Sequence, residues 1–78
     1  MGALTGHDLR TGDFVSWIGC SGIVTGRVIR HLTSPERVGG VGALGTRVRA
    51  SEESPYVVVE SEFGGVQVAQ RPEQLTRL

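Results

Sequence analysis

Cys20 and Ser21 are adjacent residues whose thiol and hydroxyl groups could act as nucleophiles, and they lie between two glycines in the run 19–22. A thiol or hydroxyl becomes a nucleophile only when a base lies within hydrogen-bond reach and a third group orients that base. The candidate bases are His7 and His31, and no pattern in the sequence brings either one to this run. Because glycine tolerates the positive φ angles of a tight reversal, we interpret the run as a hairpin turn and predict no enzyme activity.

Metal, disulfide and cofactor chemistry are not predicted either. Cys20 is the single cysteine, so the chain can form no internal disulfide and no cysteine-based metal site. The two histidines and the scattered carboxylates lack the spacing of metal ligands, and we expect no cofactor. A lone cysteine fits a reducing compartment. Since the sequence has no signal-peptide pattern and no apolar run of about 20 residues, we expect a cytoplasmic protein that does not enter a membrane.

Arginines provide a possible binding surface. All eight basic residues besides histidine are arginines, and eight acidic residues balance them, so nucleic-acid binding would require a local patch. Such a basic face would form if two predicted strands are neighbours, and its members would be Arg27, Arg30, His31, Arg47 and Arg49. The alternative is a solvated surface of mixed charge, in which the arginines pair across strands with Glu52, Glu53, Glu60 and Glu62.

The chain has four aromatic residues, which are Phe14, Trp17, Tyr56 and Phe63. Several ring faces converging on one cation could hold a methylated side chain. Because we assign Trp17 to the core, too few rings remain for a cage, and a methylated-residue reader is the weakest alternative. We instead predict that Phe14, Tyr56 and Phe63, with the glycine-rich loop 39–45, form a rim that binds a protein partner.

The elements that must position these residues are short strands. Residues 13–17 alternate, which predicts a strand with Val15 and Trp17 in the core. A second strand is predicted over 23–32, rich in β-branched residues and bent at Gly26. Alternation or β-branched runs predict three more strands over 46–50, 56–60 and 66–70.

The segments between these strands have the composition of turns. Ser34 and Pro35 end the second strand, loop 39–45 is expected to be mobile, and a polar turn is expected over 51–55. Pro72 favours one short helical turn, which would place Leu75 against the core. The sequence therefore predicts an all-β protein, a small SH3-like or Tudor-like barrel of about five bent antiparallel strands with a short C-terminal helical turn.

We expect one domain over 11–78, preceded by a flexible lead-in over 1–10 with a turn at residues 9–12. The whole pattern resembles the Tudor-like domain family of hypervirulence-associated proteins. The residues that carry the resemblance are Gly12, Asp13, Val15, Trp17, Gly22, Gly26, Val28, Thr33, Ser34, Ala50, Ser51, Pro55, Val59, Glu60, Ser61, Glu62, Gly65, Ala69, Pro72 and Leu75. Val57, Gln70 and Arg71 stand where that family usually has an aromatic residue, a histidine and a lysine. The resemblance implies a Tudor-like barrel and a non-enzymatic binding module; it does not specify a ligand.

Overall fold

A computed structural model describes residues 9–19, 21–39 and 45–78. Within these ranges the structure is almost entirely β-strand. The strands are β1 (Phe14–Gly19), β2 (Gly22–Leu32), β3 (Glu36–Val38), β4 (Thr46–Val48), β5 (Tyr56–Ser61), β6 (Gln67–Gln70) and β7 (Thr76–Arg77), and a short 3-10 helix, η2 (Pro72–Gln74), precedes β7.

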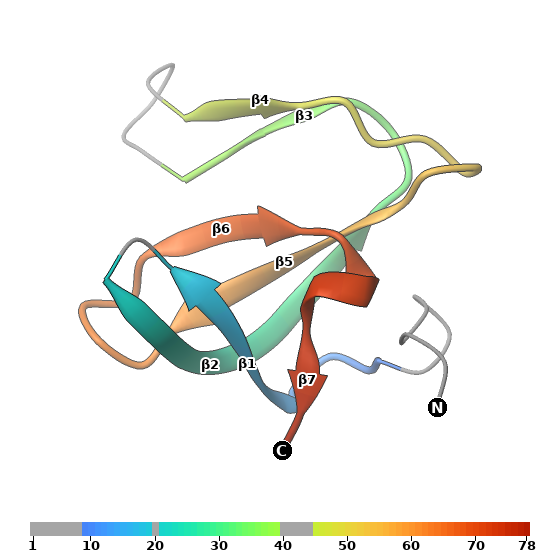
Figure 1. The fold of residues 1–78 in the computed structure, drawn as a ribbon. Coiled ribbons are helices and arrows are strands. Elements are labelled where there is room, and N and C mark those ends of the chain that lie inside the picture. Colours follow the sequence, from blue (N-terminus) through green and yellow to red (C-terminus); the bar gives the residue numbers. More distant parts are fainter. Residues whose placement is uncertain (1–8, 20, 40–44) are drawn as a thin grey trace.

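The strands form two antiparallel sheets (Figure 1). One sheet has the order β6-β5-β2-β1-β7, and the other is the hairpin β3–β4. The predicted all-β fold is confirmed. The strands β3 and β7 were not predicted, because two or three residues are too few to display an alternating pattern.

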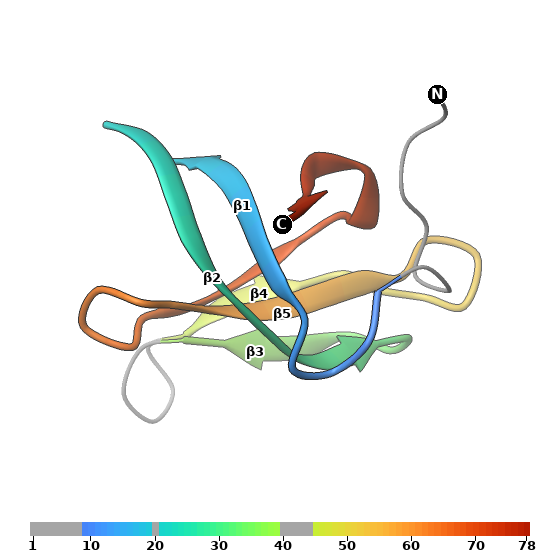
Figure 2. The same ribbon diagram turned by 90° about the horizontal axis from the view of Figure 1, so that it is seen from below.

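Strand β2 runs for 11 residues and pairs with β1 along one edge and with β5 along the other. Its pairing with β5 shifts register between Val28 and Arg30, which marks a β-bulge. A bulge bends a strand and increases its twist, and Figure 2 shows β2 curving out of the body of the domain together with β1. The second strand is bent, as predicted, but its bulge lies between Val28 and Arg30 and not at the predicted position, Gly26.

Gly26, two residues before the bulge, allows β5 and the Trp17 ring to approach β2 closely. A Cβ atom at Gly26 would overlap the backbone carbonyl oxygen of Glu60 on β5 and would lie 2.8 Å from the Trp17 ring. Real Cβ atoms do not approach their neighbours so closely, so the absence of a side chain lets the three strands pack here. Because residue 26 is a glycine, β5 and the Trp17 ring can pack directly against the backbone of β2.

Strand β5 is buried on both faces. Val57, Val58 and Val59 are all completely inaccessible to solvent. Side chains alternate along a strand, so Val57 and Val59 enter one core cluster and Val58 the other. The first cluster fills the curled sheet and contains Val15, Trp17, Val28 and Leu75; the second, with Leu32, Val38, Val48 and Ala50, joins the β3–β4 hairpin to the opposite face.

The turns follow the sequence pattern. The Asp13 side chain accepts a hydrogen bond from the Arg10 backbone N–H at 2.9 Å, which fixes the turn before β1. Ser51 and Ser54 exchange backbone hydrogen bonds in the polar turn, and Gly64 and Gly65 take positive φ angles between β5 and β6. The predicted helical turn is η2, and Leu75, which follows it, is 4% exposed.

The lead-in that we predicted over residues 1–10 requires one correction. Leu9 is 2% exposed and belongs to the first core cluster, so the packed part of the chain begins before residue 11. Residues 1–8, Cys20 and residues 40–44 lie outside the described residues, and with them most of the predicted 39–45 loop. In the described part of the chain, no helix has the length and apolar character needed to span a bilayer.

Candidate functional site

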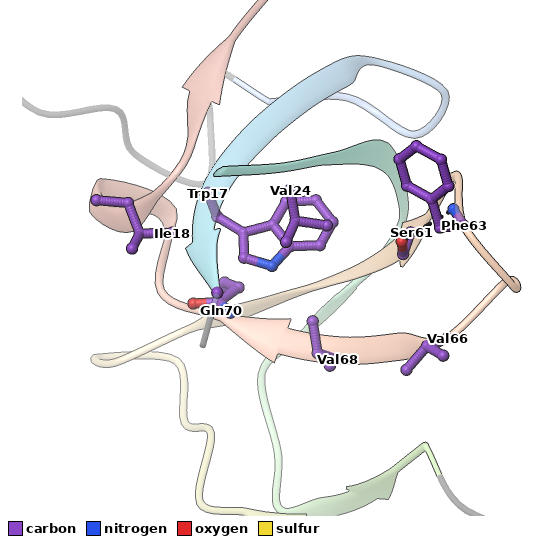
Figure 3. Close-up of a pocket in the computed structure, with 9 residues that line it drawn as sticks. Trp17, Ile18, Val24, Ser61, Phe63, Val66, Val68 and Gln70 are labelled. Carbon is purple, nitrogen blue, oxygen red and sulfur yellow. Dashed lines mark hydrogen bonds between the residues drawn. The ribbon is translucent and has the colours of Figure 1, made fainter. Parts of the chain in front are cut away.

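A pocket of about 570 Å³ opens inside the curled sheet, between the β1–β2 hairpin and the β5–β6 hairpin. Its wall includes Trp17 from β1, Val24 from β2 and Val68 from β6 (Figure 3). The strand register explains why these side chains lie on one face of the sheet. Trp17 is opposite Val24 in the first hairpin, and Val68 is opposite the core residue Val59 in the second. These side chains occupy the concave face of the sheet.

Large apolar side chains are exposed at the ends of the two hairpins that flank this pocket. Among the lining residues, Ile18 is 83% exposed, Phe63 78% and Val66 58%, and Ile23, which is 78% exposed, pairs with Ile18 across the hairpin. We call these four side chains the pocket rim. Of the six large apolar side chains exposed in the described residues, the rim includes four. Exposed apolar groups gathered in this way are typical of a binding surface.

The polar side chains that line the pocket, Ser61 and Gln70, are uncharged. The Ser61 Oγ accepts a hydrogen bond from the Phe63 backbone N–H at 3.1 Å, and the Ser61 backbone N–H donates to the Val66 carbonyl oxygen at 2.9 Å. Both bonds fix the start of the β5–β6 turn. They therefore support the position of the Phe63 side chain on the rim.

The three aromatic residues predicted to bind a partner do not form one site. Phe63 lines the pocket, whereas Phe14 is 51% exposed with the Arg27 guanidinium 5.4 Å from its ring centre. Tyr56 is half-buried beside the second core cluster, and the Arg71 guanidinium lies 5.3 Å from its ring centre. The placement of Trp17 in the core is confirmed, since it is 6% exposed. Its ring also lines the pocket.

The arginines predicted to form one basic face are divided between the two sheets. That face required β2 and β4 to be neighbours, but β2 pairs with β1 and β5, whereas β4 pairs with β3. Arg27 and Arg30 therefore belong to one sheet, and Arg47 belongs to the other, with Arg49 just after it. Arg47 instead faces Arg37, which the sequence analysis did not include.

Arg30 forms an ion pair with Glu36, in which the closest atoms are 2.6 Å apart. The hydrogen bond from Arg30 lowers the pKa of the Glu36 carboxyl, and their opposite charges add to the effect. The same hydrogen bond raises the pKa of Arg30. Glu36 was not among the acidic partners expected for the arginines, because the sequence did not predict β3. The pair connects the end of β2 to the start of the second hairpin.

The sequence analysis missed most residues of the pocket. The sequence analysis did not single out Ile18, because nothing in the sequence indicates that it lines the same pocket as Phe63, which lies 45 positions later in the chain. Only the curvature of the sheet brings the two hairpins to one opening. Among the residues that the structure describes, no group of three or more metal-ligating side chains occurs.

The fold agrees with the comparison to known families. The family described as the TUDOR domain of hypervirulence associated proteins matches residues 12–75, which is most of the 78-residue chain. The chain belongs to this family. Searches of curated proteins and of solved structures gave no match. A Tudor-like domain is a small binding module and is not typically an enzyme, so the pocket of this Tudor domain is a candidate binding site.

Proposed function

We propose that the domain is a non-enzymatic module that binds a protein segment by taking up its apolar side chains in the pocket between the two hairpins. The observation that supports this proposal is the combination of a preformed apolar pocket with four exposed apolar side chains at the ends of the two flanking hairpins. Residues that bury apolar surface at the centre of an interface contribute most of the binding free energy. Phe63 and Trp17 are the aromatic side chains available for this role.

The chemistry of the walls favours an uncharged apolar side chain over a methylated cation. A cage for a methylated side chain needs several ring faces around one point. This pocket has two rings, Trp17 and Phe63, and much of its remaining wall is aliphatic, from Val24, Val66 and Val68. The lining residues include no carboxylate, so a bound cation would lack a compensating charge.

A protein segment fits the site better than a small molecule, because the apolar surface extends beyond the pocket. Ile23 does not line the pocket, yet it is 78% exposed beside Ile18. Ile18 and Ile23 alternate with Trp17 and Val24, so they lie on the opposite face of the hairpin. A segment of several residues would place one side chain in the pocket and pass over the end of the hairpin to cover Ile18 and Ile23. We place this module in the cytoplasm, where a lone thiol such as that of Cys20 stays reduced.

The experiment uses peptides selected on the wild-type domain from a random 12-residue display library, with affinities measured by fluorescence anisotropy. We expect Phe63→Ser to weaken binding by tenfold or more, which is the effect of losing about 1.4 kcal/mol. Phe63 is 78% exposed, so this variant should remain folded. Phe14→Ser is the matched control, since Phe14 is exposed but does not line the pocket.

The control should change affinity by no more than about twofold, the size of effect common for surface residues outside an interface. If the selected peptides bind Phe63→Ser as tightly as the wild type, the pocket is not the site. If the library yields no peptide that binds the wild-type domain, the proposal of a peptide-binding module is wrong.

A further inference from the structure

The charges of this chain are unevenly distributed along the sequence, although they sum to zero. Residues 27–49 contain five of the eight arginines and one of the eight acidic residues. This stretch includes β3 and β4, whose outer surface is remote from the pocket between the other two hairpins (Figure 1). The net charge of zero is therefore the sum of a basic region, residues 27–49, and an acidic remainder of the chain.

The β3–β4 hairpin concentrates part of this charge on its outer face. Val38 and Val48 are buried in the second core cluster, so one face of the hairpin packs against the main sheet. Arg37 and Arg47 are exposed and directly opposite one another in the register. Alternation along the strand direction places Arg49, two residues after Arg47 and also exposed, on the same side. Three guanidinium groups thus share the outer surface.

This arrangement is unfavourable for the hairpin alone, because like charges directly opposite one another destabilise a pair of strands. Arg37 donates a hydrogen bond to the Gly45 carbonyl oxygen at 3.0 Å, which turns its guanidinium along the hairpin. Within the described ranges, neither Arg47 nor Arg49 forms an ion pair. Among the described residues, the charges of Arg47 and Arg49 therefore have no ion-pair partner in the protein itself.

A shallow hollow of about 140 Å³ lies on this hairpin and is lined by Pro35, Glu36, Arg37 and Arg47. Its one carboxylate, Glu36, is held by Arg30 at 2.6 Å. The carboxylate thus has a cationic partner of its own, and Arg47 contributes a positive charge to the hollow that Glu36 does not neutralise. A hollow of this size can accommodate a group such as a phosphate, but not a large side chain.

We propose that the outer face of the β3–β4 hairpin binds the phosphate backbone of nucleic acid. The planar guanidinium fork matches the geometry of phosphate oxygens and can donate two hydrogen bonds to one group. A row of arginines on an open ribbon suits a polymer with a charge at each repeat better than a single enclosed anion. The outward-facing residues of this face that the structure describes include no aromatic side chain, so we expect binding through charge, independent of base sequence.

The test measures binding of the whole domain to a fluorescein-labelled 20-nucleotide single-stranded DNA and to its RNA counterpart, by anisotropy at a series of NaCl concentrations. Three phosphate contacts predict that the logarithm of the association constant falls with the logarithm of salt concentration with a slope of about −2. Replacing both Arg47 and Arg49 with glutamate should weaken binding at least tenfold and reduce the slope by more than one. Arg47→Glu places a negative charge opposite Arg37, so the hairpin should remain folded.

The matched control replaces Arg10 and Arg77 with glutamate, because both are exposed, lie outside the hairpin and give the same change in net charge. We expect this control to retain most of the affinity and the salt slope. Equal losses in the two double variants would overturn the proposed surface, as would undetectable binding by the wild type at 20 mM NaCl. If polyglutamate binds equally tightly, the surface recognises polyanions in general, and the assignment to nucleic acid is wrong. Phe63→Ser should bind the oligonucleotides normally, so this result is independent of the pocket proposal.

Discussion

Replacing Trp17 with alanine tests whether one side chain both completes the core and forms the pocket wall. Trp17 is 6% exposed and packs in the first core cluster. An aromatic side chain buries roughly 150–250 Å², so at about 25 cal/mol per Å² its loss costs about 4–6 kcal/mol, and measured substitutions of this kind cost about 3–5 kcal/mol. In a chain of this size a single core rarely supplies more than about 3–5 kcal/mol of stability, so Trp17→Ala should be largely or completely unfolded.

The assay is urea unfolding followed by far-ultraviolet circular dichroism, because Trp17 is the only tryptophan and its fluorescence would be lost. With an m-value of about 1 kcal/mol/M, the midpoint should fall by about 3 M or more, leaving little native baseline. Phe14→Ala is the control on the same strand. Phe14 is 51% exposed, so its loss should cost only about 1 kcal/mol, including its contact with Arg27. A folded Trp17→Ala with an unchanged midpoint would refute the assignment of this ring to the core.

Two further predictions follow from Gly26 and from the Arg30–Glu36 ion pair. Gly26→Ala should destabilise the domain by about 1–3 kcal/mol or more in urea unfolding, because the new methyl group would overlap the Glu60 carbonyl oxygen and crowd the Trp17 ring; an unchanged midpoint would contradict this packing. The Glu36 carboxyl, followed by carbon-13 NMR, should titrate below its ordinary pKa, and Arg30→Met should raise that pKa towards its ordinary value. Because the folded pKa is lowered, the pair stabilises the fold above the ordinary pKa of about 4.3, and this contribution is lost as pH falls through the folded pKa. Identical titration in both proteins would exclude the hydrogen bond as the cause.

Most of the fold could be predicted because its determinants are local. Val15 and Trp17 show the alternation of a half-buried strand, and the glycines near residues 22 and 64 mark reversals. The three successive valines of β5 predict a strand without distinguishing its faces. The structure adds that both faces are buried, which depends on a hairpin formed by residues 36–48.

The candidate sites were predicted less well, because they depend on contacts between distant segments. Phe63 was predicted as a binding residue, but Ile18, which lines the same pocket, was not, since nothing near Ile18 in the sequence indicates a curved sheet. Arg47 and Arg49 were predicted to contribute to a basic surface, but with Arg27 and Arg30 as companions. The pairing of Arg37 with Arg47 could not be foreseen once β3 was missed, because a three-residue strand shows no periodicity.

The burial of β5 on both faces has a consequence for how this domain can change. Val57 and Val59 support the sheet that contains the pocket, and Val58 supports the hairpin that carries the arginines. Exposed residues on either surface can be exchanged without altering the packing beneath the other, so the pocket side and the arginine-bearing hairpin can diversify separately in one small domain. The strand between them has no such freedom, since each of its three valines is already in contact with a filled core.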